Sequence, residues 1–229
     1  MIISGLLKLT LLDFPGKTAA TVFLGGCNMR CPFCHNSGIV LSPGDTQISE
    51  DDVFAYLEKR VGILDGVCVT GGEPLLSPDI DTFLERIKSL GYDVKLDTNG
   101  TFPEKLESLV SRSLVDYVAM DIKNCPERYA ETVGIQGFDI SPILRSVEFL
   151  KSGRVSHEFR TTAVSELHDV SAFEKIGQWL SGERAYFIQK FVDSGACLKD
   201  GLSPLSDELM QKCLKVVRQY VTNAQLRGM

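Results

Sequence analysis

The sequence predicts an α/β fold, a partial (β/α)6 TIM-like barrel with parallel strands. Short apolar, β-branched runs alternate along the chain with stretches that have helical spacing. Near-continuous apolar runs of this kind suit a parallel sheet that is buried on both faces. Six such units with right-handed crossovers give a curved sheet but are too few for a full eight-stranded barrel. An open or partial barrel is therefore expected, and no linker marks off a second domain.

The six expected strands share an apolar, β-branched composition. They span residues 19–26, 66–72, 93–100, 116–123, 157–164 and 185–191. Each is followed by a segment long enough to return the chain for a further parallel strand.

The intervening segments carry recognisable helix signals. Ser49 can cap one helix, and Ser77 with Pro78 behind it can begin another, which Gly91 would end. Their apolar faces are expected to be Val53, Phe54, Leu57 and Val61 in the first helix, and Ile80, Phe83, Leu84 and Ile87 in the second. Further helices are expected at 103–113, 141–151, 171–181 and 206–226, the last of them a packing helix.

Composition narrows the function classes. A formal net charge of −6 without a dense Lys/Arg run argues against nucleic-acid binding. No apolar run approaches membrane-spanning length, and the N-terminal residues lack the basic region of a signal peptide. We therefore expect a cytoplasmic protein whose thiols stay reduced. Seven cysteines, three of them clustered, favour metal ligation over a disulfide framework.

Chemically distinctive residues gather where the predicted strands end. In βα folds the ligand site lies beyond the carboxyl ends of the strands, so these residues are expected to converge on one mouth. In chain order they are Cys27, Cys31 and Cys34; Gly71, Gly72 and Glu73; Asp97, Thr98 and Asn99; Met120, Asp121 and Lys123; Arg160; and Gln189 and Lys190.

The three clustered cysteines have C-x3-C-x2-C spacing, which two kinds of site could explain. Thiolates bind both zinc and iron–sulfur clusters. A structural zinc site normally has four protein ligands, often as two separated pairs, and the other four cysteines form no second pair. His35 could complete a Cys3His set, although adjacent residues rarely aim at one metal. Spacing thus favours a cluster and leaves zinc open.

Several stretches together resemble a known family. The stretch GCNMRCPFCHN, with Phe33 before its last cysteine, and TGGEPLL at 70–76 resemble the signatures of the radical S-adenosylmethionine (SAM) enzymes. With LDTNG and AMDIK, they resemble the branch that activates glycyl-radical enzymes such as pyruvate formate-lyase and anaerobic ribonucleotide reductase. The resemblance runs from about residue 5 to about 192. It implies a single radical SAM domain over residues 1–229 with its core at about 17–192.

The resemblance implies cofactors and residue roles. Cys27, Cys31 and Cys34 would hold a [4Fe-4S] cluster whose fourth iron binds SAM, and one electron would cleave the sulfonium to give a 5′-deoxyadenosyl radical. The remaining implied contacts involve the methionine amino group (Gly71, Gly72, Glu73), its carboxylate (Lys123), the cofactor surroundings (Phe33, Asn99, Asp121, Arg160) and a possible monovalent cation (Asp97, Thr98 and the Met120 carbonyl). From its residue type alone, Arg160 could equally cap a strand end.

The resemblance therefore predicts an activase that makes a glycyl radical on a partner, either anaerobic ribonucleotide reductase or a pyruvate formate-lyase-like enzyme. A flavodoxin or ferredoxin would be the reductant. No cysteine-rich insert lies between Cys34 and Cys68, so a single cluster is expected. Two alternatives stay open: a radical SAM enzyme acting on a small molecule or peptide, and a non-catalytic zinc- or cluster-binding module.

Overall fold

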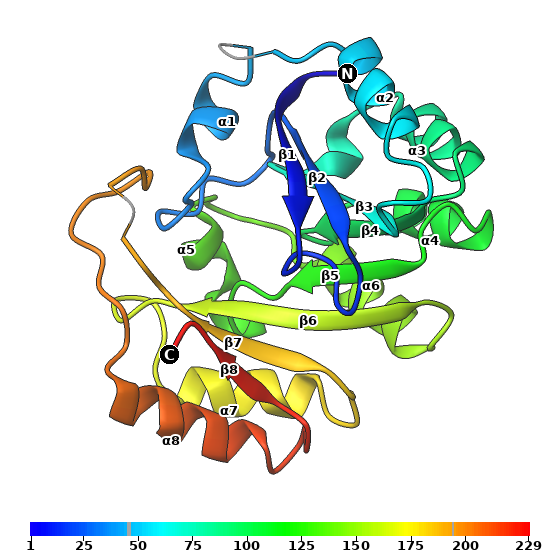
Figure 1. Cartoon of the computed structure of the whole chain (residues 1–229). Coiled ribbons are helices and arrows are strands. Elements are labelled where there is room, and N and C mark those ends of the chain that lie inside the picture. The colour runs from blue at the N-terminus through cyan, green and yellow to red at the C-terminus, as the bar shows by residue number, and fades with distance from the viewer. Residues whose placement is uncertain (45–46, 194) are drawn as a thin grey trace. The chain divides into compact units, whose positions relative to one another are not determined.

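The computed structural model describes residues 1–44, 47–193 and 195–229, and its strands form a mixed, mostly parallel sheet (Figure 1). The sheet order follows the chain from β1 to β8, so β1 and β8 are its ends and the sheet does not close on itself. The α/β class with parallel strands is confirmed. The strands are β1 (Ile3–Thr10), β2 (Ala19–Leu24), β3 (Gly66–Gly71), β4 (Asp93–Thr98), β5 (Tyr117–Asp121), β6 (Ser156–Ala163), β7 (Tyr186–Lys190) and β8 (Gln225–Arg227).

The chain forms two compact units, each assembled from separate stretches of sequence. The first unit comprises Met1–Asn28, Gly38–Ala119 and Arg145–Ser156, and the second comprises Met29–Ser37, Met120–Leu144 and His157–Met229. Each unit is described below by itself. In the described part of the chain, no helix is both long enough and apolar enough to cross a membrane.

In the first unit, three strand pairings set the positions of the loops. β1 runs antiparallel to β2, whereas β2, β3 and β4 run parallel, with Leu24 opposite Gly71 at the carboxyl ends of β2 and β3. The α-helices that lie wholly in this unit are α2 (Glu50–Glu58), α3 (Ile80–Ser89) and α4 (Pro103–Ser111), and the 3-10 turn η1 (Pro74–Leu76) follows β3. The Ser49 side chain accepts a hydrogen bond from the Asp52 backbone N–H and caps α2, as predicted.

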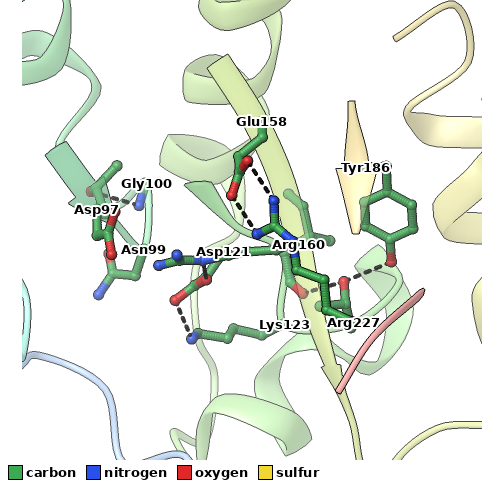
Figure 2. Close-up of polar contacts among 12 residues, drawn as sticks. Asp97, Asn99, Gly100, Asp121, Lys123, Glu158, Arg160, Tyr186 and Arg227 are labelled. Carbon is green, nitrogen blue, oxygen red and sulfur yellow. Dashed lines mark hydrogen bonds and ion pairs between the residues drawn. The ribbon is translucent and has the colours of Figure 1, made fainter. Parts of the chain in front are cut away.

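In the second unit, β6, β7 and β8 are parallel neighbours. The helical elements that lie wholly in it are η2 (Pro126–Arg128), α5 (Tyr129–Val133), α7 (Val170–Trp179) and α8 (Asp207–Val217), while α1 (Ser37–Leu41) and α6 (Ser141–Lys151) contribute residues to both units. In Figure 1, α7 and α8 lie side by side. Arg227 at the end of β8 holds the buried Glu158 carboxylate of β6 by two hydrogen bonds of 2.8 and 2.9 Å (Figure 2).

All six predicted strands are present, and each ends one or two residues earlier than predicted. Two strands were not predicted. β1 leaves Leu7 and Leu9 exposed and so lacks the pattern of a buried strand, and β8 has only three residues. The helices at 103–113, 141–151 and 171–181 are confirmed as α4, α6 and α7 within two residues at each end.

Three details of the predicted helices are wrong. Ser77 ends the turn η1 instead of capping α3, because Pro74 and Leu75 already start a helical turn after Glu73. Val61 lies beyond the end of α2 and is exposed. The helix predicted at 206–226 ends at Val217, and the chain then turns into β8, although Ala224 is still buried. Buried apolar residues in that turn continue the helical spacing by coincidence.

Replacing Arg227 with Ala should lower the free energy of unfolding by about 2 to 3 kcal/mol, because it removes two charge-assisted hydrogen bonds from the buried Glu158 carboxylate. Urea unfolding of the reconstituted protein would measure this. Arg112→Ala is the matched control, since Arg112 pairs with Asp81 and Glu85 on the surface, and it should cost about 1 kcal/mol or less. Equal losses for the two variants would contradict a specific role for the Glu158 pair.

Candidate functional site

Gly71 and Gly72, at the end of the second predicted strand, lie directly against the backbone at the end of the neighbouring strand β2. The Gly72 N–H donates to the Leu24 carbonyl at 2.9 Å, and the Glu73 N–H donates to the Gly26 carbonyl at 2.8 Å. A Cβ on Gly71 would lie 2.2 Å from the Leu24 oxygen, and one on Gly72 would lie 1.9 Å from the Gly26 oxygen. Gly71 also has a φ of +126°, which favours glycine. The glycines thus permit a close approach to the stretch that leads into Cys27.

Glu73 is fully buried, and its carboxylate joins the ends of β3 and β4. It accepts hydrogen bonds from the Leu75 N–H at 3.1 Å, the Thr98 hydroxyl at 2.9 Å and the Asn99 N–H at 2.6 Å. A buried carboxylate is costly unless it is bonded in this way. The Glu73 carboxylate, which follows the two glycines, therefore fixes the positions of Thr98 and Asn99.

Asn99 takes part in a polar network beside Cys27. Its Nδ2 donates to Asn28 Oδ1 at 2.9 Å and lies 4.0 Å from the Cys27 sulfur, while its Oδ1 accepts from the Thr101 hydroxyl at 2.6 Å. The Asn28 amide in turn donates to Thr101 Oγ1 at 2.9 Å. Neither Asn28 nor Thr101 was predicted as a site residue, although Asn28 lies within the cysteine motif and Thr101 directly follows LDTNG. This network fixes the orientation of the polar side chains beside Cys27.

Asp97 is paired with a lysine from its own strand. Lys95 Nζ donates to Asp97 Oδ1, and the Cys68 sulfur lies 3.8 Å from both groups. Lys95 and Asp97 are two residues apart on β4, so their side chains point to the same face. Lys95 is 2% exposed, which makes it a fully buried ammonium group. Lys95 lies outside the motifs that predicted the site.

In the second unit, Asp121 lies between two cations. Its carboxylate accepts from Arg160 Nε at 2.6 Å and from Lys123 Nζ at 3.0 Å (Figure 2). Burial acts to raise the pKa of Asp121, but Arg160 and Lys123 outweigh it and hold that pKa well below its usual range. For Lys123, burial acts to lower the pKa, but Asp121 and Cys31 outweigh it and the pKa is raised. The three groups are therefore all charged at neutral pH.

The aromatic residue before the last clustered cysteine is part of the same neighbourhood. Phe33 is 4% exposed, and its ring centre lies 6.0 Å from Lys123 Nζ, within the range of a cation–π contact. The ring of His35 stacks on Phe191 with 5.3 Å between ring centres. Phe33 and Lys123, two sequence-predicted residues from different motifs, are thus brought together.

Backbone hydrogen bonds within the second unit anchor the cysteine-bearing stretch 29–37. The Arg30 N–H donates to the Val133 carbonyl at 2.9 Å, and the Lys199 N–H donates to the Pro32 carbonyl at 3.0 Å. Gly134, with a φ of +69°, comes so close to Arg30 that a Cβ would lie 2.3 Å from the Arg30 oxygen. No sequence pattern pointed to these anchors, because they connect backbone groups that carry no motif.

His168 supports the Lys123 segment from within the core. The Val164 N–H donates to His168 Nδ1 at 3.1 Å, so the ring proton of the neutral imidazole lies on Nε2, which donates to the Lys123 carbonyl at 2.8 Å. His168 is 3% exposed, and burial lowers its pKa. The histidine therefore stays neutral and positions the backbone of Lys123.

The predicted site residues divide between the two units. Cys27, Gly71, Gly72, Glu73, Asp97, Thr98 and Asn99 belong to the first, and Cys31, Phe33, Cys34, Met120, Asp121, Lys123 and Arg160 belong to the second. Within residues 1–44, 47–193 and 195–229, no three His, Cys, Asp or Glu side chains form a group that could hold a metal ion. The Met120 side chain is buried and carries no polar group.

Comparison with known proteins identifies related sequences and folds. The Radical SAM superfamily matches residues 21–166. A Methanocaldococcus jannaschii protein, provisionally named a glycyl-radical enzyme activating enzyme, is 34% identical over 99% of this chain and 95% of its own length. The pyruvate formate-lyase-activating enzyme of Listeria monocytogenes is 36% identical over 52% of each chain. The SAM-bound structure of SuiB from Streptococcus suis superposes with a TM-score of 0.72 at 13% identity, covering 91% of this chain and 50% of SuiB.

Replacing Gly72 with Ala should destabilise the protein, because the added Cβ would overlap a backbone carbonyl that cannot move aside. We expect a loss of about 3 kcal/mol or more in the free energy of unfolding, measured by urea titration. Gly38→Ala is the control, since nothing lies within 4 Å of its Cβ position, and it should be nearly neutral. A near-neutral Gly72→Ala would show that the two strand ends can separate.

His168 should make the protein less stable in mild acid. The unfolded chain takes up a proton near the ordinary pKa of 6.5, whereas folded His168 resists protonation, so falling pH favours unfolding. The contribution is at most about 1.4 kcal/mol per pH unit below 6.5. Urea unfolding from about pH 7.5 to about 5.5 should show a flatter pH dependence for His168→Gln than for the wild type. An unchanged slope in His168→Gln would contradict this assignment.

Proposed function

Because the chain belongs to the radical SAM superfamily, we propose that it is an activating enzyme that generates a glycyl radical on a partner enzyme. The observation that carries the proposal is the 34% identity to the Methanocaldococcus jannaschii protein, which extends over nearly the whole of both chains. We propose anaerobic ribonucleotide reductase or a pyruvate formate-lyase-like enzyme as the partner, and a flavodoxin or ferredoxin as the electron donor. We place the activity in the cytoplasm and in one radical SAM domain over residues 1–229.

The family implies a [4Fe-4S] cluster and SAM, and the donor set of this chain fits both. Cys27, Cys31 and Cys34 supply three thiols within eight positions, and none of the seven cysteines, all of them in the described residues, is in a disulfide. When bound, the cluster and SAM would supply the radical chemistry that removes a hydrogen atom from glycine, with an external reductant providing the electron. The residues of this chain bind and orient these groups.

We assign Lys123 to the methionine carboxylate of SAM. Its ammonium group is charged, lies beside Phe33 and shares the Asp121 carboxylate with Arg160. Because Arg160 also neutralises Asp121, Lys123 can turn toward a ligand's carboxylate without leaving the half-buried Asp121 without a cation. Arg160 and Asp121 thereby hold the local charge balance while Lys123 contacts the cofactor.

We assign the methionine amino group to the segment Gly71–Glu73. The Glu73 carboxylate is already engaged by Leu75, Thr98 and Asn99, so the contact would come from backbone carbonyl oxygens of this segment. The hydrogen bonds of the Glu73 side chain would hold those oxygens in place. Asn99 would orient the surroundings of Cys27 through Asn28, and buried Phe33 would exclude water.

Two other functions were left open by the sequence. Membership of the radical SAM superfamily favours the enzyme over a non-catalytic zinc module, because the superfamily binds a cluster and SAM. A radical SAM enzyme acting on a small molecule or peptide would use the same cofactor residues, so only the substrate distinguishes it from an activase.

The proposal is tested by anaerobic reconstitution with iron and sulfide, followed by incubation with SAM, dithionite and the glycyl-radical enzymes encoded in the same genome. We expect SAM cleavage together with the electron paramagnetic resonance signal of a glycyl radical on one of them. Cys31→Ala should lose both cluster and cleavage. Cys213→Ala, whose buried thiol lies in α8, should keep both. SAM cleavage without a glycyl radical on any candidate would favour the small-molecule or peptide substrate, and uptake of zinc without cluster or cleavage would contradict the enzyme.

A further inference from the structure

Lys95 is a buried ammonium group that the proposed chemistry does not use. It lies on β4 opposite Cys68 of β3, which in turn lies opposite Thr21 of β2, so strand pairing fixes its place inside the first unit. At 2% exposure it cannot reach water. A lysine this deeply buried is rare and needs a compensating charge in the protein.

The compensating charge is Asp97. Lys95 Nζ donates to the Asp97 carboxylate, and the softer Cys68 sulfur completes the surroundings at 3.8 Å from each. The neighbouring Thr98 hydroxyl donates to Glu73 at 2.9 Å and accepts from the Gly100 N–H at 3.1 Å. Asp97 thus already has a univalent cation beside it, supplied by its own strand.

Asp97 and Thr98 are also the residues expected to supply side-chain oxygens to a monovalent metal ion. A lysine ammonium has the same charge as K⁺ or Na⁺ and also seeks carboxylate oxygens. A metal ion bound at the same carboxylate would sit within a few ångströms of the ammonium, where two like charges repel strongly because little water screens them. A metal ion and the Lys95 ammonium group would therefore compete for the same carboxylate.

We propose that the Lys95 ammonium group takes the place of a monovalent metal ion beside Asp97, so that this protein needs no such ion. Lys95 is then a positioning residue that neutralises Asp97 at the end of β4. The inference concerns charge balance within the first unit and does not depend on glycyl-radical activation.

Two variants of Lys95 separate charge from volume. Lys95→Ala removes the ammonium and leaves room for an ion next to Asp97, whereas Lys95→Met removes the charge and fills most of the space. Lys105→Met is the matched control, because Lys105 Nζ donates to the backbone carbonyls of Leu75 at 2.8 Å and Ser77 at 3.3 Å and not to a carboxylate. Each reconstituted protein is studied anaerobically in KCl and in tetramethylammonium chloride of equal ionic strength.

The two measurements are the Tm and the binding of rubidium, a K⁺ mimic, by equilibrium dialysis. The wild type and Lys105→Met should each have the same Tm in both salts, and neither should bind rubidium saturably. In tetramethylammonium, Lys95→Ala and Lys95→Met should melt lower than the wild type by roughly 6 to 15 °C. In KCl, Lys95→Ala alone should recover at least about half of that loss and should bind one rubidium ion.

Saturable rubidium binding by the wild type that Asp97→Asn abolishes would overturn the proposal, since ion and lysine would then coexist. Identical behaviour of Lys95→Ala and Lys95→Met in the two salts would also overturn it. Where a single variant does not fold, the double variant Lys95→Met/Asp97→Asn decides. It should fold and melt higher than Lys95→Met, because it no longer leaves the Asp97 carboxylate without the Lys95 ammonium group. Failure of the double variant to regain stability would count against the pairing.

Discussion

The backbone contact between Gly71–Gly72 and Leu24–Gly26 is the constraint on which the first unit depends. β2 and β3 keep a parallel register up to Leu24 and Gly71, and the chain continues in contact past that point through the bonds of Gly72 and Glu73. The loop that leads to Cys27 and the loop that carries Glu73 therefore leave the sheet at the same level. Any side chain at either glycine would push them apart, so the placement of the first cysteine depends on two missing Cβ atoms.

Carboxylates with little or no exposure to solvent make up the second layer of this organisation, and each has donors in its own unit. Glu73 uses two backbone N–H groups and a hydroxyl, Asp97 uses Lys95, and Glu158 uses Arg227. Each of these bonds joins polar groups that would be costly to bury alone, and the bonds of Glu73 and Glu158 also connect different strands. The same groups that stabilise the sheet also fix the positions of the residues that follow its strands.

The sequence predicted the parts of the fold that have a periodic or compositional signal. Buried parallel strands such as β2 and β3 are continuous apolar runs, and the Ser49 cap has a local chemistry that sequence alone reveals. β8 carries no such signal, because it is held by the non-local pair of Arg227 with Glu158. The end of α8 was missed for a related reason: apolar spacing records which residues are buried and not whether the backbone is still helical.

In the site, too, the motifs predicted individual residues but not the partners that determine what each residue can do. Asp97 and Lys123 were predicted from motifs, but what distinguishes them is the partner two residues away: Lys95 for the first and Asp121 for the second. Strand alternation places Lys95 and Asp97 on one face of β4, whereas Lys123 lies two residues beyond the end of β5, and the two pairs have different consequences. Lys95 is 2% exposed and locked onto its carboxylate, whereas the side chain of Lys123 is 18% exposed and shares Asp121 with Arg160. A lysine whose carboxylate has a second cation can be recruited by a ligand, and a buried lysine that neutralises its carboxylate stays in place. Burial and charge sharing, which no motif encodes, thus assign opposite roles to two similar ion pairs.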